Sequence, residues 1–165
     1  MYVTSTGIED GVIADRYGKR GEVNQHGIPT RSLPLSIHEA PVGTVTYAVV
    51  IEDKDAYPVS GGFAWIHWLA ANIEESEIEE NASATRRFPQ GANSWTSVQG
   101  GSCPLDVCSA YGGMAPPNCE HLYEIHVYAL DAKLPLKDGF LLNDLHRAMD
   151  GHVLAQYTLK GAYDK

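Results

Sequence analysis

Apolar and polar residues alternate along several segments of the chain, and this alternation predicts β-strands. The segments are residues 43–51, 65–73, 122–130 and 153–159. Successive side chains of a strand point to opposite faces of a sheet. We therefore expect Trp65, His67 and Leu69 to share one face of the second strand. On the third strand we expect His121 and Tyr123 to share a face with the apolar residues that follow.

Near the C-terminus the apolar residues recur at helical spacing, which predicts one helix over about residues 138–150. Asp138 is suited to cap its N-terminus, and Gly151 is suited to close it in left-handed geometry. Residues 3–34 are rich in glycine, charge and turn residues, which is typical of an extended segment with short strands. Strands separated by turns, with one late helix, favour a mainly β sandwich over βαβ units.

Three segments between the predicted strands have the composition of connections. Residues 57–62 contain Pro58 and two glycines, which predicts a loop. Residues 74–80 are acidic, and we expect a solvated turn or a short helix there. Residues 91–117 form a long Gly- and Ser-rich connection, and connections of that length are often functional.

Composition and charge narrow the class of protein. A length of 165 residues with 44% apolar residues suits one domain with a sizeable core. The net charge of −9 disfavours non-specific contact with nucleic acid or an anionic membrane. The sequence contains neither an apolar run near the ~18 residues of a spanning helix nor the pattern of a signal peptide. We therefore expect a cytoplasmic protein that does not span a membrane.

Acids, histidines and a tyrosine stand beside the apolar strands, where buried polar groups need partners. Asp53 and Asp55 follow the first strand, either as carboxylates that orient a histidine or as caps of an Asx-turn. Their spacing also matches the start of an aspartyl phosphatase motif, which Tyr57 disfavours. His67 lies between two tryptophans and reads either as a satisfied core residue or as a hydrogen-bond donor to a ligand.

Four short motifs, in this order and spacing, resemble those of the phosphatidylethanolamine-binding protein family, in its bacterial and archaeal Raf-kinase-inhibitor-like branch. The motifs are Asp53-Lys54-Asp55-Ala56-Tyr57-Pro58, Trp65-Ile66-His67, Gly113-Met114-Ala115-Pro116-Pro117 and His121-Leu122-Tyr123. The similarity runs from about Thr4 to Tyr163. It implies a single domain over residues 1–165, with two antiparallel sheets packed as a β-sandwich and small peripheral helices. The chain departs from the family pattern at Lys54, which replaces a proline, and at Tyr57, which is inserted.

The resemblance also implies a ligand pocket that accepts phosphate, a phosphorylethanolamine headgroup or a similar small anion. The expected ligand-binding residues are Asp53, Asp55, Trp65, His67, Ala115, Pro116, His121 and Tyr123. Pro116 and Pro117 would hold the backbone before them extended, which leaves the N–H groups of Met114 and Ala115 to an anion. Tyr111 is a further candidate for the wall of the pocket. Some family members inhibit kinases or proteases, so a protein partner of this kind is an open expectation. A homodimer is a further open expectation.

Two other kinds of site remain open at this point. Asp53, Asp55, His67 and His121 form a possible two-His, carboxylate metal set, which would make the chain a metal-dependent hydrolase. Cys103, Cys108 and Cys119 with His121 are a candidate zinc set, and one disulfide is a further alternative, but the spacings favour free thiols. The sequence lacks a nucleophile elbow, a phosphate loop and a dinucleotide fingerprint. We therefore expect a binding protein without a cofactor or a metal, and no enzyme.

Overall fold

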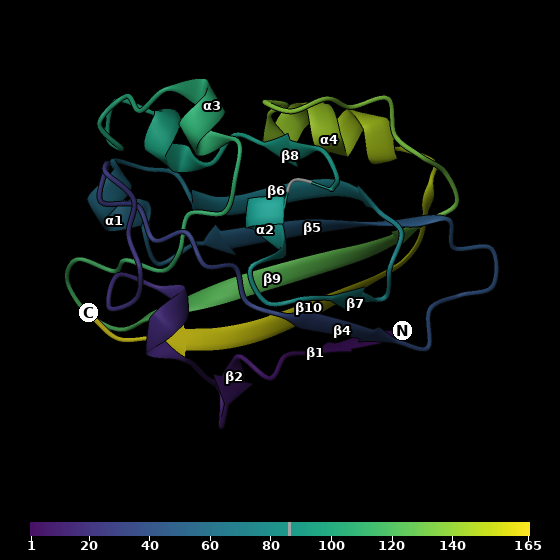
Figure 1. Cartoon of the computed structure of the whole chain (residues 1–165), viewed down its shortest axis with the longest axis horizontal. Helices are drawn as coiled ribbons and strands as arrows, with labels where there is room; N and C mark the ends of the chain where they lie inside the picture. The colour runs from purple at the N-terminus through teal and green to yellow at the C-terminus, as the bar shows by residue number, and fades with distance from the viewer. Residues whose placement is uncertain (86) are drawn as a thin grey trace.

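A seven-stranded sheet forms the centre of the molecule, and its long strands come from the alternating segments of the sequence (Figure 1). A computed structural model describes residues 1–85 and 87–165. In spatial order the strands are β2 (Ile8–Glu9), β3 (Val12–Ile13), β10 (Val153–Tyr163), β9 (His121–Leu130), β5 (Thr46–Asp53), β6 (Trp65–Ile73) and β8 (Gln90–Gly91). Neighbouring strands run antiparallel, apart from the parallel pair of β10 and β3.

A second, three-stranded sheet packs against one face of the first. Its strands are β1 (Tyr2–Thr4), β4 (Leu35–His38) and β7 (Glu77–Ile78). Val3 and Ile37 from this sheet join Val49, Ile51 and Val127 from the larger sheet in one buried cluster. This core between two sheets confirms the predicted β-sandwich.

The opposite face of the large sheet is partly covered by α4 (Leu142–Met149). Leu145 packs there in a second buried cluster with Val50 of β5. The helix lies within the predicted range but begins at Leu142, because the Asp138 carboxylate accepts from the Gln90 N–H group at 2.9 Å instead of capping a helix. Gly151 has φ +78°, which confirms the left-handed backbone conformation expected just after the helix.

Short helices occupy the connections. They are η1 (Asp15–Tyr17), α1 (Tyr57–Ser60), α2 (Ala82–Thr85), η2 (Ser94–Thr96) and α3 (Leu105–Cys108). Residues 57–62 are predicted as a loop, but the helix α1 occupies the first four of them. Residues 74–80 are predicted as a turn or a short helix, but they contain the strand β7. Figure 1 shows α1 beside the end of β5 that carries Asp53, while α4 lies toward the other end of the sheet. Within the described residues, no helix has the length and apolar character needed to cross a bilayer.

Candidate functional site

A pocket of about 240 Å³ opens where β5 ends and where β6 and β9 begin. Six of the eight predicted site residues line it: Asp53, Trp65, His67, Ala115, His121 and Tyr123. Six further residues complete the wall, from α1, the 95–99 segment and the proline turn: Ala56, Val59, Ser60, Trp95, Gln99 and Pro117. Trp95 was missed, although a tryptophan in a Gly- and Ser-rich connection with a suspected function was a usable signal.

Two predicted residues are not part of this wall. The Asp55 carboxylate is exposed and accepts from the Leu122 N–H group at 2.9 Å, so it ties the loop after β5 to the start of β9. Pro116 is buried, and its carbonyl accepts from the Lys19 ammonium at 2.6 Å. Both residues therefore position the rim from outside.

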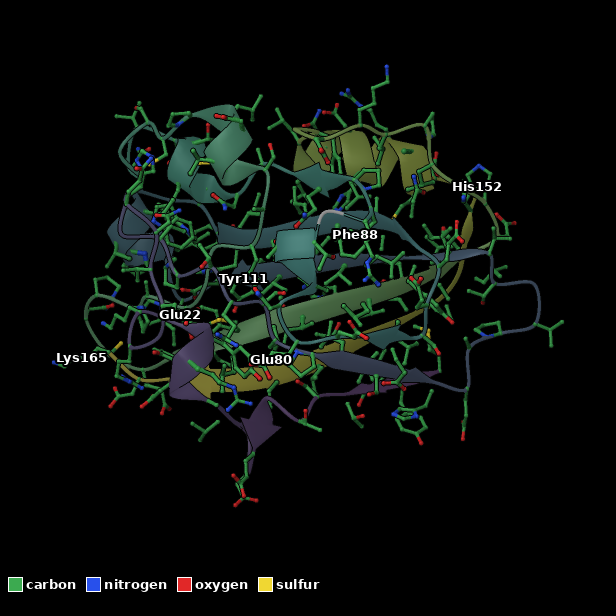
Figure 2. All side chains as sticks on the ribbon, viewed as in Figure 1. Glu22, Glu80, Phe88, Tyr111, His152 and Lys165 are labelled. Carbon is green, nitrogen blue, oxygen red and sulfur yellow. The ribbon has the colours of Figure 1, made fainter. Side chains whose placement is uncertain are left out.

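Tyr111, the other candidate for the wall, lies in the core (Figure 2). Its hydroxyl donates to the Tyr17 carbonyl at 2.8 Å, and its ring meets that of Trp68 edge to face, with the ring centroids 5.8 Å apart. Tyr111 therefore supports the fold and does not face the pocket.

An extra residue in β6 turns His67 toward the pocket. Ile51 of β5 lies opposite Trp68, but the next residue of β5 lies opposite Ile66, so the pairing skips His67. Beyond this shift the alternation is reversed, and Leu69 joins the cluster under α4. The expectation that Leu69 shares a face with His67 is therefore wrong. Such bulges are common next to functional sites, where they redirect a side chain.

The His67 ring is held in one tautomer by the backbone. Its Nδ1 atom lies 2.7 Å from the Gly112 carbonyl oxygen and 3.0 Å from that of Gly113. Carbonyl oxygens only accept, so Nδ1 must carry a proton. Burial lowers the pKa of His67, and the nearby Asp53 charge opposes that shift only in part. The neutral ring therefore presents the lone pair of Nε2 on its other side.

Asp53 and His121 form a buried pair across β5 and β9. The Asp53 Oδ2 atom accepts from His121 Nδ1 at 2.7 Å, and Oδ1 accepts from the Ala56 N–H group at 3.2 Å. The side chains are 4% and 1% exposed, so water contributes little to their solvation. His121 Nε2 faces Asn118 Oδ1 at 2.8 Å. Both ring nitrogens of His121 therefore face an oxygen atom of a neighbouring side chain.

Two buried donors in the pocket wall have no hydrogen-bond partner. They are the Trp65 indole Nε1 atom and the Tyr123 hydroxyl. Among the described residues, the Tyr17 hydroxyl is the other buried side-chain atom without a hydrogen-bond partner. Burial, reinforced by the Asp53 charge, raises the pKa of Tyr123 above its usual range, so the phenol stays protonated. An unsatisfied buried donor costs about 1–3 kcal/mol. Two of them in one pocket favour a ligand with acceptor oxygens.

The rival metal sets are not assembled. Within residues 1–85 and 87–165, the side chains whose potential metal-ligating atoms gather within 4.8 Å are Glu52, Glu124 and His126, on the far face of the sheet. None of Asp53, Asp55, His67 and His121 belongs to that group. Nδ1 of His67 faces a backbone carbonyl oxygen, and the Asp55 carboxylate accepts from a backbone N–H group.

The cysteines also fail to form the candidate zinc set. Cys103, Cys108 and Cys119 are free, and none of them belongs to the group of close ligating atoms found among the described residues. Burial and the neighbouring Cys103 raise the pKa of Cys108 to about 11, which keeps its thiol protonated at neutral pH.

Comparison with known proteins agrees with the motifs. The family model described as phosphatidylethanolamine-binding protein matches residues 4–164. YxkA of Bacillus subtilis is 41% identical over 152 residues, which cover 88% of this chain and 90% of that protein. A UPF0098 protein of Methanothermobacter thermautotrophicus is 34% identical over 155 residues, which cover 93% of this chain and 91% of the relative.

Solved structures have the same fold. The phosphatidylethanolamine-binding protein homologue CT736 of Chlamydia trachomatis superimposes with a TM-score of 0.79 at 30% identity, over 99% of this chain and 97% of that chain. YbcL of Escherichia coli, at 23% identity, has a TM-score of 0.76 over 99% and 98% of the two chains and supports the fold alone. With its fold and nearly its whole length matched, the chain belongs to the phosphatidylethanolamine-binding protein family.

Proposed function

We propose that the protein binds a small ligand with a phosphate group, such as phosphate or a phosphorylethanolamine headgroup, in the pocket between β5, β6 and β9. The observation that carries this proposal is the pair of unpartnered buried donors, Trp65 Nε1 and the Tyr123 hydroxyl, in one pocket wall. Phosphate oxygens accept such hydrogen bonds, and a charged acceptor makes them stronger than neutral ones.

The size of the pocket favours a headgroup over a whole lipid. Pockets for drug-sized ligands occupy about 300–1,000 Å³. The volume here is about 240 Å³, which suits a few non-hydrogen atoms around one tetrahedral group.

The remaining wall fits the amine of such a headgroup. Asp53 is the carboxylate among the described residues that line the pocket, and it can accept from an ammonium group as well as from His121. Trp95 and Trp65 meet edge to face with their ring centroids 5.3 Å apart. Indole faces attract cations, so these rings suit the cationic end of the ligand.

Titration calorimetry with Trp65→Phe tests the proposal. This change keeps an aromatic ring and removes the N–H donor. We expect the affinity for phosphorylethanolamine to fall by roughly 10- to 150-fold, because one hydrogen bond to a charged group contributes about 1.5–3 kcal/mol. Trp68→Phe is the matched control, since Trp68 Nε1 donates to Gln90 Oε1 at 2.7 Å in the core. Equal affinities of Trp65→Phe and the wild type would contradict the proposal.

A role in modulating a kinase or a protease rests on the family resemblance alone, and a cytoplasmic location and a homodimer stay predictions. The same variant separates such a role from headgroup binding. A partner captured equally by the wild type and by Trp65→Phe would indicate that the partner contacts a surface other than the pocket.

A further inference from the structure

We propose that His67 makes the pocket selective for phosphate monoesters over sulfate esters, because its Nε2 atom accepts a hydrogen bond from a protonated oxygen of the ligand. This inference rests on the proposed binding of a phosphate group and adds a requirement to it. The bound ligand must bring its own proton, or take one up on binding. A tetrahedral anion without such a proton fits the same space and is rejected.

The tautomer of His67 is fixed by rigid backbone. The two carbonyl groups that hold Nδ1 belong to Gly112 and Gly113. The Gly112 N–H group donates to the His67 carbonyl at 2.8 Å, and the Gly113 N–H group donates to the Pro29 carbonyl at 2.9 Å. A Cβ atom on Gly112 would come within 2.6 Å of the Trp95 ring, and one on Gly113 within 2.2 Å of the Tyr17 carbonyl oxygen. These hydrogen bonds and this close packing hold the backbone that carries the two carbonyl groups.

The groups around the ring keep it neutral. Asp53 on β5 and His121 on β9 are the titratable groups that act on the pKa of His67, and they act in opposite directions. The Asp53 carboxylate accepts from His121 and from the Ala56 N–H group, and its charge opposes the effect of burial on the pKa of His67 only in part. Tyr123 and Trp95 cover the ring edge to face, with ring centroids at 5.1 Å and 5.4 Å. Burial is the largest of these effects, and it lowers the pKa of His67.

The two ligand classes differ in the atom that would meet Nε2. A phosphate monoester has its second pKa near 6, so a monoanion with one P–OH group is accessible at neutral pH. That hydroxyl can donate to the Nε2 lone pair, while the charged oxygens accept from the Tyr123 hydroxyl and Trp65 Nε1. A sulfate ester is fully ionised at neutral pH and offers only acceptors. Its third oxygen would face the lone pair of His67 Nε2. The repulsion between the two could be removed only by protonation of the buried His67 ring.

Matched ligands test this selectivity in the wild-type protein. Titration calorimetry at pH 7.5 would compare O-phosphorylethanolamine with its sulfate counterpart, 2-aminoethyl hydrogen sulfate. We expect the phosphate ester to bind at least tenfold more tightly and, in buffers of different ionisation enthalpy, to take up a proton. Equal or tighter binding of the sulfate ester would overturn the selectivity and leave phosphate binding standing. Absence of binding by both esters would overturn the proposed function together with this inference.

A substitution and a spectroscopic measurement make the role of His67 specific. His67→Gln replaces an obligate acceptor by an amide that can also donate, so we expect the preference for phosphate over sulfate to fall below about threefold. Circular dichroism and the melting temperature control for folding of this variant. In the unliganded wild type at pH 7.5, the ¹⁵N chemical shifts of His67 should show a protonated Nδ1 and an unprotonated Nε2. A proton on Nε2 at that pH would overturn the inference, whatever the stability of the variant.

Discussion

Glu52 and Asp53 are neighbours on β5, yet they point to opposite faces of the sheet and reach different environments. Glu52 lies in an ionic cluster whose charges are balanced, and this cluster consists of Glu52, Glu124, His126, Lys54 and Lys160. In it Lys160 lies 2.8 Å from Glu124, and His126 lies 3.1 Å from Glu52. Asp53 lines the pocket and is paired with His121, while two buried donors of the same pocket wall have no partner.

The comparison shows why residue type alone does not identify a site. The ionic cluster has the residue types of a metal site, two glutamates and a histidine with their ligating atoms within 4.8 Å. Two lysine ammonium groups already neutralise the carboxylates there, so the arrangement is complete as it stands. The pocket is incomplete, since burying a donor without a partner costs free energy that a ligand can restore. The unpartnered donors of the pocket therefore point to a ligand there, whereas the residue types of the ionic cluster do not.

The largest expected contrast between the two faces is in stability. Asp53→Ala leaves buried His121 without its carboxylate, and removing one partner of a buried pair costs about 3–5 kcal/mol in the free energy of unfolding. Glu124→Ala on the other face removes contacts to half-exposed lysines, and we expect a loss of about 1 kcal/mol. Urea denaturation measures both values. Asp53→Asn keeps an acceptor for His121 and should fall between them, whereas equal losses for the two alanine variants would contradict the comparison.

The unpartnered hydroxyl of Tyr123 predicts opposite effects on binding and stability. Tyr123→Phe should weaken phosphorylethanolamine binding by about 1.5–3 kcal/mol, the contribution of a hydrogen bond to a charged group. It should leave the melting temperature nearly unchanged, because the hydroxyl donates no hydrogen bond in the free protein and loses only its contact with the Ala115 N–H group. Tyr111→Phe is the matched control, since it loses the bond to the Tyr17 carbonyl and should lower stability by about 1 kcal/mol without affecting binding. A Tyr123→Phe variant that is destabilised as much as the control would show that the hydroxyl has a structural partner.

The two faces should also titrate in different pH windows. The pKa of His67 is lowered by burial, so below the unfolded value of ~6.5 the unfolded chain binds a proton that the folded protein does not. Stability should therefore fall as pH drops below about 6.5, by at most ~1.4 kcal/mol per pH unit. Lys160 and Lys54 lower the pKa of Glu124 from 4.5 to about 2, so its contribution is complete above about pH 4.5 and is lost as pH falls toward 2.

Unfolding measured from pH 2 to 8 checks both windows. His67→Gln should flatten the profile below about pH 6.5, and Glu124→Gln should flatten it only below about pH 4.5. A His67→Gln profile parallel to that of the wild type above pH 5 would show that His67 has the same pKa in the folded and unfolded states.

The long strands of the large sheet could be predicted from the sequence, because the alternation of apolar and polar residues is a local property of the chain. β6 has the predicted bounds, residues 65–73, and β9 extends the predicted strand by His121 alone. The start of α4 could not be predicted, since Asp138 is suited to cap a helix but is engaged by Gln90 from a distant strand. Tertiary contacts of this kind override local propensity.

The candidate site was predictable in part, and mainly through the family motifs. Those motifs named Asp53 and His121, but they could not show that His67 is an extra residue in its strand, because a bulge leaves no mark in the alternation before it. Nor could they find Trp95, which reaches the pocket from a connection without periodicity. The role of Asp55 depends on one backbone N–H group of β9, a contact between residues far apart in the sequence. Whether the lining residues bind a ligand stays a prediction.

The smallest expected effect comes from Lys54, where the chain departs from the family motif. Its ammonium contacts Glu124 and lies 3.3 Å from Glu52, but the lysine side chain is 54% exposed. Exposed ion pairs contribute about 0.2–1 kcal/mol, so Lys54→Ala should lower the free energy of unfolding by no more than that. The loss should shrink in 1 M salt, where the screening length is about 3 Å. Headgroup affinity should not change, because Lys54 faces the ionic cluster and is not among the described residues that line the pocket. A Lys54→Ala variant with weaker headgroup binding would show that the two faces are coupled through β5, and the contrast between a complete and an incomplete face would then fail.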